Sequence, residues 1–225
     1  MFSSELTPKA EQTRARIRAA AIESFIERGY PDTTIRLIAR EAGVSVGNAY
    51  YYFPSKTHLV QELYEQVQQD HARVAVPLLE GVTGLVDRLR IVFETGLATL
   101  EPYQRVAPGF LSAMIAPDSP INPLARESSG AREMTIALFR RAVDGAEHRL
   151  PEDIAKRLPE ALFVAFLGLI VRWTYDEDDH TRTRRLLDTA LKLLAVALPF
   201  VRVPGVPGVR GVARDLLDQI AEVRA

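Results

Sequence analysis

The sequence contains no cysteine in its 225 residues. This absence excludes disulfide bonds, thiol catalysis and cysteine-based zinc sites, and it suits a reducing compartment. The 4 histidines are scattered along the chain and have no spacing typical of metal ligands. We therefore expect neither a bound metal nor another cofactor.

Long hydrophobic segments are also absent. The longest apolar run, 161–171, has 11 residues. A membrane-spanning helix requires about 20 such residues. The first five residues lack the basic region and apolar core of a secretion signal. We expect a soluble, cytoplasmic protein that does not insert into a membrane.

Charge is nearly balanced over the whole chain but is unevenly distributed. The net charge is −1, which by itself argues weakly against nucleic-acid binding. Residues 1–56, however, contain eight lysines and arginines against six acidic residues, a net charge of +2, while the remainder carries −3. A basic N-terminal unit has the sign expected of a DNA-facing domain. With 47% hydrophobic residues, the chain can also bury a substantial core.

The most informative stretch is 33–56, which predicts two short helices joined by a tight turn. Thr33 or Thr34 can cap the first helix, whose apolar residues recur at helical spacing on one face. These residues are Ile35, Ile38, Ala39 and Ala42. Gly43 can end this helix in the left-handed conformation, and Ser45 can cap the second helix. Together these signals form the helix-turn-helix pattern.

Three consecutive tyrosines lie in the second helix of this pattern. Because residues on a helix are about 100° apart, Tyr50, Tyr51 and Tyr52 spread over about 200° and cannot all face one core. At least one must be exposed. Its neighbours Asn48 and Lys56 offer amide and ammonium donors suited to base edges and phosphates. The plainer alternative is that the tyrosines are partly buried residues of an ordinary helical hairpin.

A further helix is expected before this pattern, at 13–29, with Ile17, Ala21 and Phe25 on its apolar face. It would complete a three-helix unit, a common format for DNA-binding domains. Three arginines in its first turns can either reach a phosphate or form a solvated face. These are Arg14, Arg16 and Arg18.

The rest of the chain shows helical periodicity and no strand signal. Ser55 can cap a long connecting helix at 56–74, and Pro108 predicts a break in a later helix. The later helices are expected at 78–100, 104–115, 123–146, 151–175 and 181–201. Residues 202–211 are rich in proline and glycine and predict a linker, which a short amphipathic helix follows. The predicted fold class is all-α.

Residues 33–56 strongly resemble the N-terminal signature of the TetR family of bacterial transcriptional regulators. The resemblance lies in Thr33-Thr34-Ile35-Arg36-Leu37-Ile38-Ala39-Arg40-Glu41-Ala42-Gly43-Val44-Ser45 and in Tyr50-Tyr51-Tyr52-Phe53-Pro54-Ser55-Lys56. It implies a homodimeric, ligand-responsive repressor that binds a pseudopalindromic operator in double-stranded DNA and an unidentified small-molecule effector. The expected domains are a helix-turn-helix head at 1–56, a ligand-binding and dimerisation domain at 57–201, and an arm with a short helix at 202–225.

The resemblance also implies which residues contact DNA. Thr34 and Lys56 would contact phosphates, and Arg36 a base edge or a phosphate. The other implied contacts are Ser45, Val46, Gly47, Asn48, Tyr50 and Tyr52. The chain departs from the family at Ala49, where many relatives carry a larger aliphatic residue. Val46 and Gly47 have no side-chain hydrogen bond to offer. We therefore expect operator choice to depend more on Arg36, Asn48 and Tyr50 and on DNA shape.

The C-terminal part offers candidates for a dimer surface and for an effector pocket. The segment 161–171 is apolar nearly all round, and 181–201 is rich in leucine and alanine. Packing within their own domain is one reading, and an isologous four-helix interface with a second copy is the other. The candidate pocket residues are Phe93, Tyr103, Phe110, Met114, Met134, Phe139, Phe166, Trp173 and Tyr175. Each can be ordinary core, but as a set they favour an apolar ligand.

Two motifs suggest other functions. Residues 43–47 spell G-x-S-x-G, the motif of a hydrolase nucleophile at Ser45, but this motif requires a strand before the turn, and here a helix is expected. We therefore do not expect an enzyme. Residues 176–180 combine four acidic residues with a histidine, which predicts a solvated connector more than a metal site. A helical adaptor that uses the head for protein contacts is a further alternative.

Overall fold

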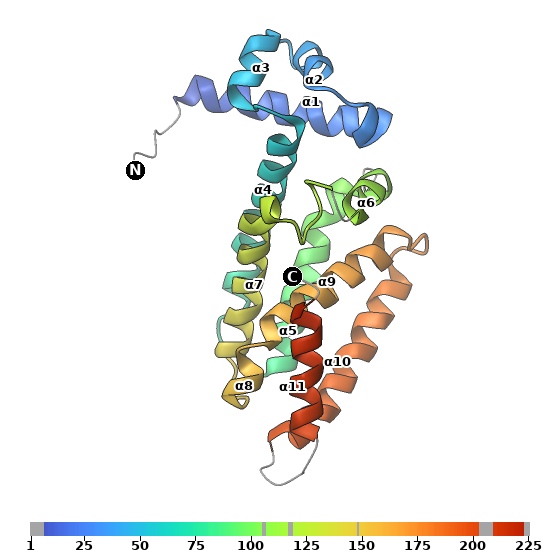
Figure 1. Ribbon diagram of the computed structural model, residues 1–225. Helices are drawn as coiled ribbons and strands as arrows, with labels where there is room; N and C mark the ends of the chain where they lie inside the picture. Colours follow the sequence, from blue (N-terminus) through green and yellow to red (C-terminus); the bar gives the residue numbers. More distant parts are fainter. Residues whose placement is uncertain (1–6, 105–106, 117–118, 148, 203–208, 223–225) are drawn as a thin grey trace. The chain divides into compact units, whose positions relative to one another are not determined.

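A computed structural model describes residues 7–104, 107–116, 119–147, 149–202 and 209–222, and these residues contain helices but no strand (Figure 1). This confirms the predicted all-α class. The α-helices are α1 (Pro8–Asp32), α2 (Ile35–Glu41), α3 (Val46–Tyr52), α4 (Lys56–Leu78), α5 (Leu85–Leu100), α6 (Ala107–Ile115), α7 (Ser129–Asp144), α8 (Glu152–Ala155), α9 (Leu158–Thr174), α10 (Thr181–Arg202) and α11 (Val209–Glu222). Two short 3₁₀ helices, η1 (Glu101–Tyr103) and η2 (Arg126–Ser128), precede α6 and α7. None of the described helices is both long enough and apolar enough to cross a bilayer.

The chain folds into two compact units whose limits differ from the expected domains. The first unit consists of the chain up to Gln66 together with Tyr103–Ser128, and the second consists of Val67–Pro102 and the chain from Ser129 onward. The expected boundary at residue 56 missed that α6 and the loop after it fold with the N-terminal helices. Helix α4 begins in the first unit and ends in the second.

Helix α1 is longer than expected because it begins at a proline. Pro8 takes the first helical position, and the Thr7 hydroxyl caps the helix by accepting a hydrogen bond from the amide of Ala10 at 3.3 Å. Near the other end, Gly29 has a φ of 81° and a ψ of 164°, which interrupts the helix. Only glycine adopts such a conformation without strain, so this position ends the regular part of α1.

The core of the first unit contains the apolar residues that helical periodicity predicted. Ile17, Ala21 and Phe25 of α1 are buried, as are Ile35 and Ile38 of α2. The other buried residues of this core are Ala20, Ala39, Ala49, Phe53, Leu59, Val60 and Ile121. The last of these lies far along the chain in the loop after α6, and it is fully buried.

Contacts between α4 and the loop after α6 explain this burial. The Gln61 amide donates to the carbonyl of Pro120 at 2.9 Å and to the Ser128 hydroxyl at 3.1 Å. The Tyr64 hydroxyl donates to the carbonyl of Ile121 at 3.1 Å. Three hydrogen bonds therefore attach the loop to the first half of α4.

The second unit is organised around aromatic rings of α5, α7 and α9. Phe93 and Phe139 lie 5.0 Å apart between ring centroids, and Phe166 lies about equally close to both, at 5.9 and 6.0 Å. Helix α11 packs against α9 and α10 (Figure 1), and an ion pair between Arg157 and Asp218 attaches it to the start of α9. Most of the predicted linker, 203–208, lies outside the described residues.

A buried arginine joins the helix ends of the second unit. The Arg88 side chain of α5 donates to the carbonyls of Leu79 at 2.9 Å and Val82 at 2.6 Å, just after α4. It also donates to the carbonyls of Arg141 at 3.0 Å and Ala142 at 2.8 Å, near the end of α7. Helix C-termini leave carbonyls unpaired and carry partial negative charge, so a guanidinium satisfies both needs.

Candidate nucleic-acid interface

The turn between α2 and α3 has the predicted helix-turn-helix geometry. Gly43 has a φ of +65°, and the amide of Val44 donates to the carbonyl of Ala39 at 3.0 Å, which closes α2. The Ser45 hydroxyl then accepts a hydrogen bond from the amide of Asn48 at 3.1 Å and caps α3. The hydroxyl at this position is thus part of a helix cap between two helices, which is not the strand-to-helix turn of a hydrolase nucleophile.

Helix α3 buries one side and exposes the other. Ala49 is fully buried, whereas Val46 is 41% exposed and Tyr50 45% exposed, and Gly47 and Asn48 are exposed beside them. A small residue at position 49 therefore faces the core of the unit. The exposed side is the surface that sequence reasoning assigned to DNA.

The three tyrosines of α3 differ in exposure, as their spread of about 200° around the helix predicted. Tyr51 is 77% exposed, which makes it the most exposed of the large apolar residues identified in the described chain. Tyr52, which was among the expected DNA contacts, is half-buried against the core, and its ring lies edge-on to that of Tyr51 at 5.2 Å. Tyr51 was not among the expected contacts, although the angular spacing of the three tyrosines could have identified it as exposed.

Helix α2 contributes Thr34, Arg36 and Arg40 to the exposed surface of the first unit. The Thr34 hydroxyl accepts a hydrogen bond from the amide of Leu37 at 3.2 Å, so it caps α2. Thr33, the other capping candidate, instead donates to the carbonyl of Gly29 at 2.8 Å. The two arginines are one helical turn apart and lie on the same side of α2.

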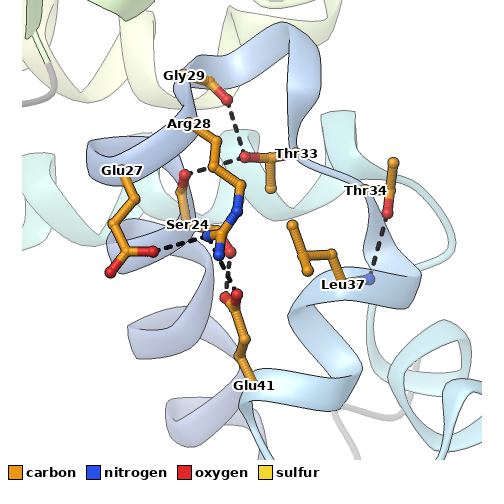
Figure 2. A network of polar contacts seen from close by, with 8 residues as sticks. All are labelled: Ser24, Glu27, Arg28, Gly29, Thr33, Thr34, Leu37 and Glu41. Carbon is orange, nitrogen blue, oxygen red and sulfur yellow. Dashed lines mark hydrogen bonds and ion pairs between the residues drawn. The ribbon is translucent and has the colours of Figure 1, made fainter.

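A polar network fixes α2 against α1 (Figure 2). The Glu41 carboxylate of α2 accepts a hydrogen bond from the buried Ser24 hydroxyl and forms an ion pair with Arg28 at 3.1 Å. Arg28 also pairs with Glu27 at 2.8 Å. Sequence reasoning missed this network because a serine in α1 and a glutamate in α2 carry no periodic signal that relates them.

The arginines at the start of α1 have partners within the first unit. Arg14 donates to Glu62 of α4 through two nitrogens, with its Nε at 2.8 Å from one carboxylate oxygen, and Arg18 donates to the other oxygen at 2.8 Å. The Arg14 guanidinium also lies over the Phe53 ring, 5.5 Å from its centroid. Only Arg16 of the three is exposed. Arg14 and Arg18 thus join α1 to α4 in place of the phosphate contact considered from the sequence.

Lys56 is also engaged within its own chain. Its ammonium donates to the carbonyls of Tyr30 at 2.5 Å, Thr33 at 2.8 Å and Pro31 at 3.3 Å. Burial lowers the pKa of Lys56, and the nearby Asp32 carboxylate partly offsets this effect. An ammonium has three hydrogens, and each of them has a carbonyl acceptor within the chain. The phosphate contact expected of Lys56 stays a prediction.

The expected pocket residues do not form one set. Phe93, Phe139 and Phe166 lie together in the second unit, beside the buried His71. Phe110 lies in the first unit, where its ring contacts Phe25 at 4.9 Å. Met114 packs against the same core, and Tyr103 lies in the same unit. Trp173, in the second unit, stacks on His180 at 5.2 Å, while Met134 is half-buried and Tyr175 is exposed.

His71 gives the aromatic cluster a polar edge. Its Nε2 lies 2.9 Å from the carbonyl of Val92 and 3.2 Å from the Thr95 hydroxyl. Burial lowers the pKa of His71, and the hydrogen bond with Val92 offsets part of this effect. A methyl group at Gly96 would lie 2.5 Å from the Phe166 ring and 3.0 Å from His71, so the cluster is tightly packed here.

The acidic segment after α9 is only partly solvated. Asp176 is buried and accepts hydrogen bonds from the Thr183 amide at 2.7 Å and hydroxyl at 2.8 Å, which caps the start of α10. Burial alone would raise the pKa of Asp176, but these hydrogen bonds outweigh it and hold the pKa below its usual value. His180 is buried too, whereas the residues between them are exposed. No group of three potential metal ligands exists in the described residues.

Helices α2 and α3 are joined by a tight turn and pack on α1, and α3 is capped and has one exposed side. This arrangement defines the class of helix-turn-helix proteins. The model of bacterial regulatory proteins of the tetR family matches residues 17–63. The model of the tetracyclin repressor-like C-terminal domain matches residues 88–200, half of the chain. The chain therefore belongs to the tetR family of bacterial transcriptional regulators.

Individual relatives support this assignment. The HTH-type transcriptional regulator TtgR of Pseudomonas putida is 40% identical over 67 residues, which are 30% of this chain and 32% of TtgR. The match to this curated relative thus spans about a third of its length. NalD of Pseudomonas aeruginosa, the secondary repressor of the MexAB-OprM multidrug efflux pump, is 27% identical with a TM-score of 0.56 and covers 82% of this chain and 96% of NalD.

A third relative shares the fold alone. A TetR-family regulator of Syntrophomonas wolfei superposes with a TM-score of 0.63 over 83% of this chain and 96% of its own, at 18% identity. The helical architecture of the family thus extends over most of the chain.

Proposed function

We propose that the protein is a ligand-responsive repressor that binds a pseudopalindromic DNA operator as a homodimer. The observation that carries this proposal is the outward face of α3, which is capped by Ser45 and exposes Val46, Gly47 and Tyr50. An apolar tip on a short helix suits the floor of the major groove, where thymine methyl groups offer apolar contacts. The repressor activity named for NalD supports the same direction of regulation.

The hydrogen-bonding contacts would come from residues that flank this apolar tip. Arg36 and Asn48 are exposed and can donate to base edges, and the Tyr50 hydroxyl can reach a phosphate. The first amides of α2 and α3, next to Thr34 and Ser45, form helix N-termini that attract phosphates. Base readout by hydrogen bonds is then limited to a few side chains, and DNA shape supplies the rest.

The proposed dimer surface lies on α9 and α10. Helix α10 buries one apolar face and exposes a second, whose residues are spaced alternately by four and three positions. These residues are Leu186, Ala190, Leu193, Ala197 and Phe200. This spacing is that of a helix seam packed against a second helix. On α9, Ala165, Gly168 and Val171 are exposed, and a methyl group at Gly168 would meet no atom within 4 Å, so a partner helix can approach closely.

We propose that the effector binds in the second unit near Phe93, Phe139, Phe166 and His71. Three aromatic rings and one buried imidazole suit an apolar ligand with a single hydrogen-bonding group. Helix α4 carries His71 in the second unit and begins with Lys56 in the first. A ligand that shifts α4 would therefore change the state of the DNA-binding unit by its differential affinity for the two states.

Selection of bound sequences from random DNA tests this function directly. We expect the purified protein to enrich a pseudopalindrome whose half-sites lie about 34–36 Å apart. Arg36→Ala should weaken binding to that operator and relax the preference at one base pair, which costs about 1–3 kcal/mol of discrimination. Exposed Arg149, in the second unit, provides a control variant that should keep full affinity. Failure to enrich any sequence would contradict the proposal.

A further inference from the structure

Lys56 occupies the junction of three helices in the first unit. It is the first residue of α4, and its side chain reaches back to the segment between α1 and α2. The ammonium has carbonyl acceptors at Tyr30, Pro31 and Thr33, and it lies 4.1 Å from the centroid of the Tyr30 ring. One side chain thus contacts three carbonyls and one aromatic ring of the short connecting segment.

The connecting segment needs such a cation. Gly29 interrupts α1, so the carbonyls that follow it lie at the C-terminal end of a helix and lack N–H donors within that helix. A helix C-terminus carries partial negative charge, which a nearby ammonium stabilises. The Tyr30 ring adds a cation–π contact. Burial lowers the pKa of Lys56, and the nearby Asp32 carboxylate offsets part of this effect.

The connecting segment leads directly to the DNA-facing residues of α2. Thr33 is followed by Thr34, which caps α2, and Arg36 lies in the first turn. A lysine that fixes the carbonyls of Tyr30 and Thr33 therefore fixes where α2 begins. We infer that Lys56 is a positioning residue that sets the placement of Thr34 and Arg36, and that it does not bind a phosphate itself. This inference rests on the proposed DNA-binding function and replaces the role that family resemblance implied for Lys56.

The salt dependence of operator binding separates the two roles. A lysine that neutralises a phosphate releases a counterion from the DNA. Loss of such a lysine therefore makes the negative slope of log K against log[salt] shallower by about 0.9 for each bound head. For Lys56→Met we expect binding to be weakened by about tenfold to a hundredfold, as for loss of hydrogen bonds to a charged group. We expect the slope to stay equal to that of the parent protein. Base preference at the pair read by Arg36 should be relaxed, because the arginine is displaced.

Two further variants sharpen the comparison. Lys56→Arg keeps the charge but replaces three convergent hydrogens with a planar fork, so it should behave like Lys56→Met if positioning is the role. If Lys56 instead contacts a DNA phosphate, arginine can make the same contact, and Lys56→Arg should keep most of the parent protein's affinity for DNA. Exposed Lys156, paired with Glu152 on α8, is the control, and Lys156→Met should alter neither affinity nor slope.

A measurement without DNA covers the case in which the variants do not bind at all. Amide hydrogen exchange of the full-length protein should become faster in α2, residues 35–41, in Lys56→Met and remain unchanged in α10. A slope reduced by about 0.9 per head, together with unchanged exchange in α2, would overturn the inference. If the parent protein binds no DNA, the proposed function fails, whereas the exchange result still decides whether Lys56 positions α2.

Discussion

Single residues at helix ends determine the geometry of the DNA-facing surface. Ser45 caps α3, Thr34 caps α2 and Gly43 makes the turn between them in the left-handed conformation. Each signal is local, so the sequence alone was sufficient to predict it. The choice between Thr33 and Thr34 was left open, because it depends on the Gly29 carbonyl that Thr33 binds.

The cap at Ser45 gives a prediction for stability. Ser45→Ala should lower the free energy of unfolding by about 1 kcal/mol, because the amide of Asn48 loses its acceptor. Ser45→Gly should cost only a few tenths of a kcal/mol, since glycine is itself tolerated at this position. Urea denaturation of both variants checks the order. Equal stability of Ser45→Ala and the parent protein would show that the hydroxyl does not serve as a cap.

His71 gives a prediction for pH dependence. Burial lowers its pKa in the folded protein. As the pH falls below about 6.5, the unfolded chain therefore binds a proton that the folded chain does not, and the free energy of unfolding decreases. The decrease continues until the pH reaches the pKa of the folded state. Urea denaturation at pH 7.5 and at pH 5.5 measures it.

A variant assigns this effect to one histidine. His71→Gln keeps a donor for the Val92 carbonyl but cannot titrate, so its stability should decrease less between the two pH values. His58→Gln, at an exposed histidine of α4, should retain the decrease of the parent protein. Parallel pH profiles of His71→Gln and the parent would contradict the assignment.

At the scale of helices and loops, the first unit depends on a segment that no local pattern connects to it. Helical periodicity predicted α1 and α2 with their buried faces, the turn and cap signals predicted α3, and periodicity predicted the later helices approximately. It could not show that Ile121 completes the N-terminal core, or that Arg14 and Arg18 pair with Glu62. These contacts join residues more than 40 positions apart, and only the tertiary arrangement brings them together.

Ile121 therefore carries a prediction at this scale. Ile121→Ala should lower the free energy of unfolding of the first unit by about 2–5 kcal/mol, because it leaves a cavity in a closed core. The nearby Leu124 is only half-buried, and Leu124→Ala should cost less. Hydrogen exchange at the amides of α1 and α3 reports on this unit directly. Protection that is unchanged in Ile121→Ala would show that the loop is not part of the core.

At the scale of the whole molecule, α10 presents apolar residues on two separate faces. Leu187 and Leu191 are buried within the second unit, whereas Leu193 is 70% exposed and Phe200 is 54% exposed. Periodicity predicted an apolar helix, but it could not separate a face buried in the domain from one that a second copy would cover. The exposed face supports the proposed homodimer, since contiguous apolar surface of this kind marks interaction sites.

A charge at the centre of this face should separate the subunits. For Leu193→Glu we expect sedimentation equilibrium to show monomers at micromolar concentration, where we expect the parent protein to form dimers, because the interface would bury an unpaired carboxylate. Ala195 is exposed on the polar side of the same helix, and Ala195→Glu should remain dimeric. A dimeric Leu193→Glu would place the interface elsewhere.

The interleaving of the two units along the chain limits how this regulator can be recombined with others. A chimera joined after Gln66 would combine this N-terminal segment with a foreign 103–128 segment, so the pocket for Ile121 would receive an unrelated side chain. The acceptors for Gln61 and Tyr64 would be replaced as well. Exchange of DNA specificity between relatives should therefore succeed when the two segments are transferred together, which makes the transferable part of this protein discontinuous in its gene.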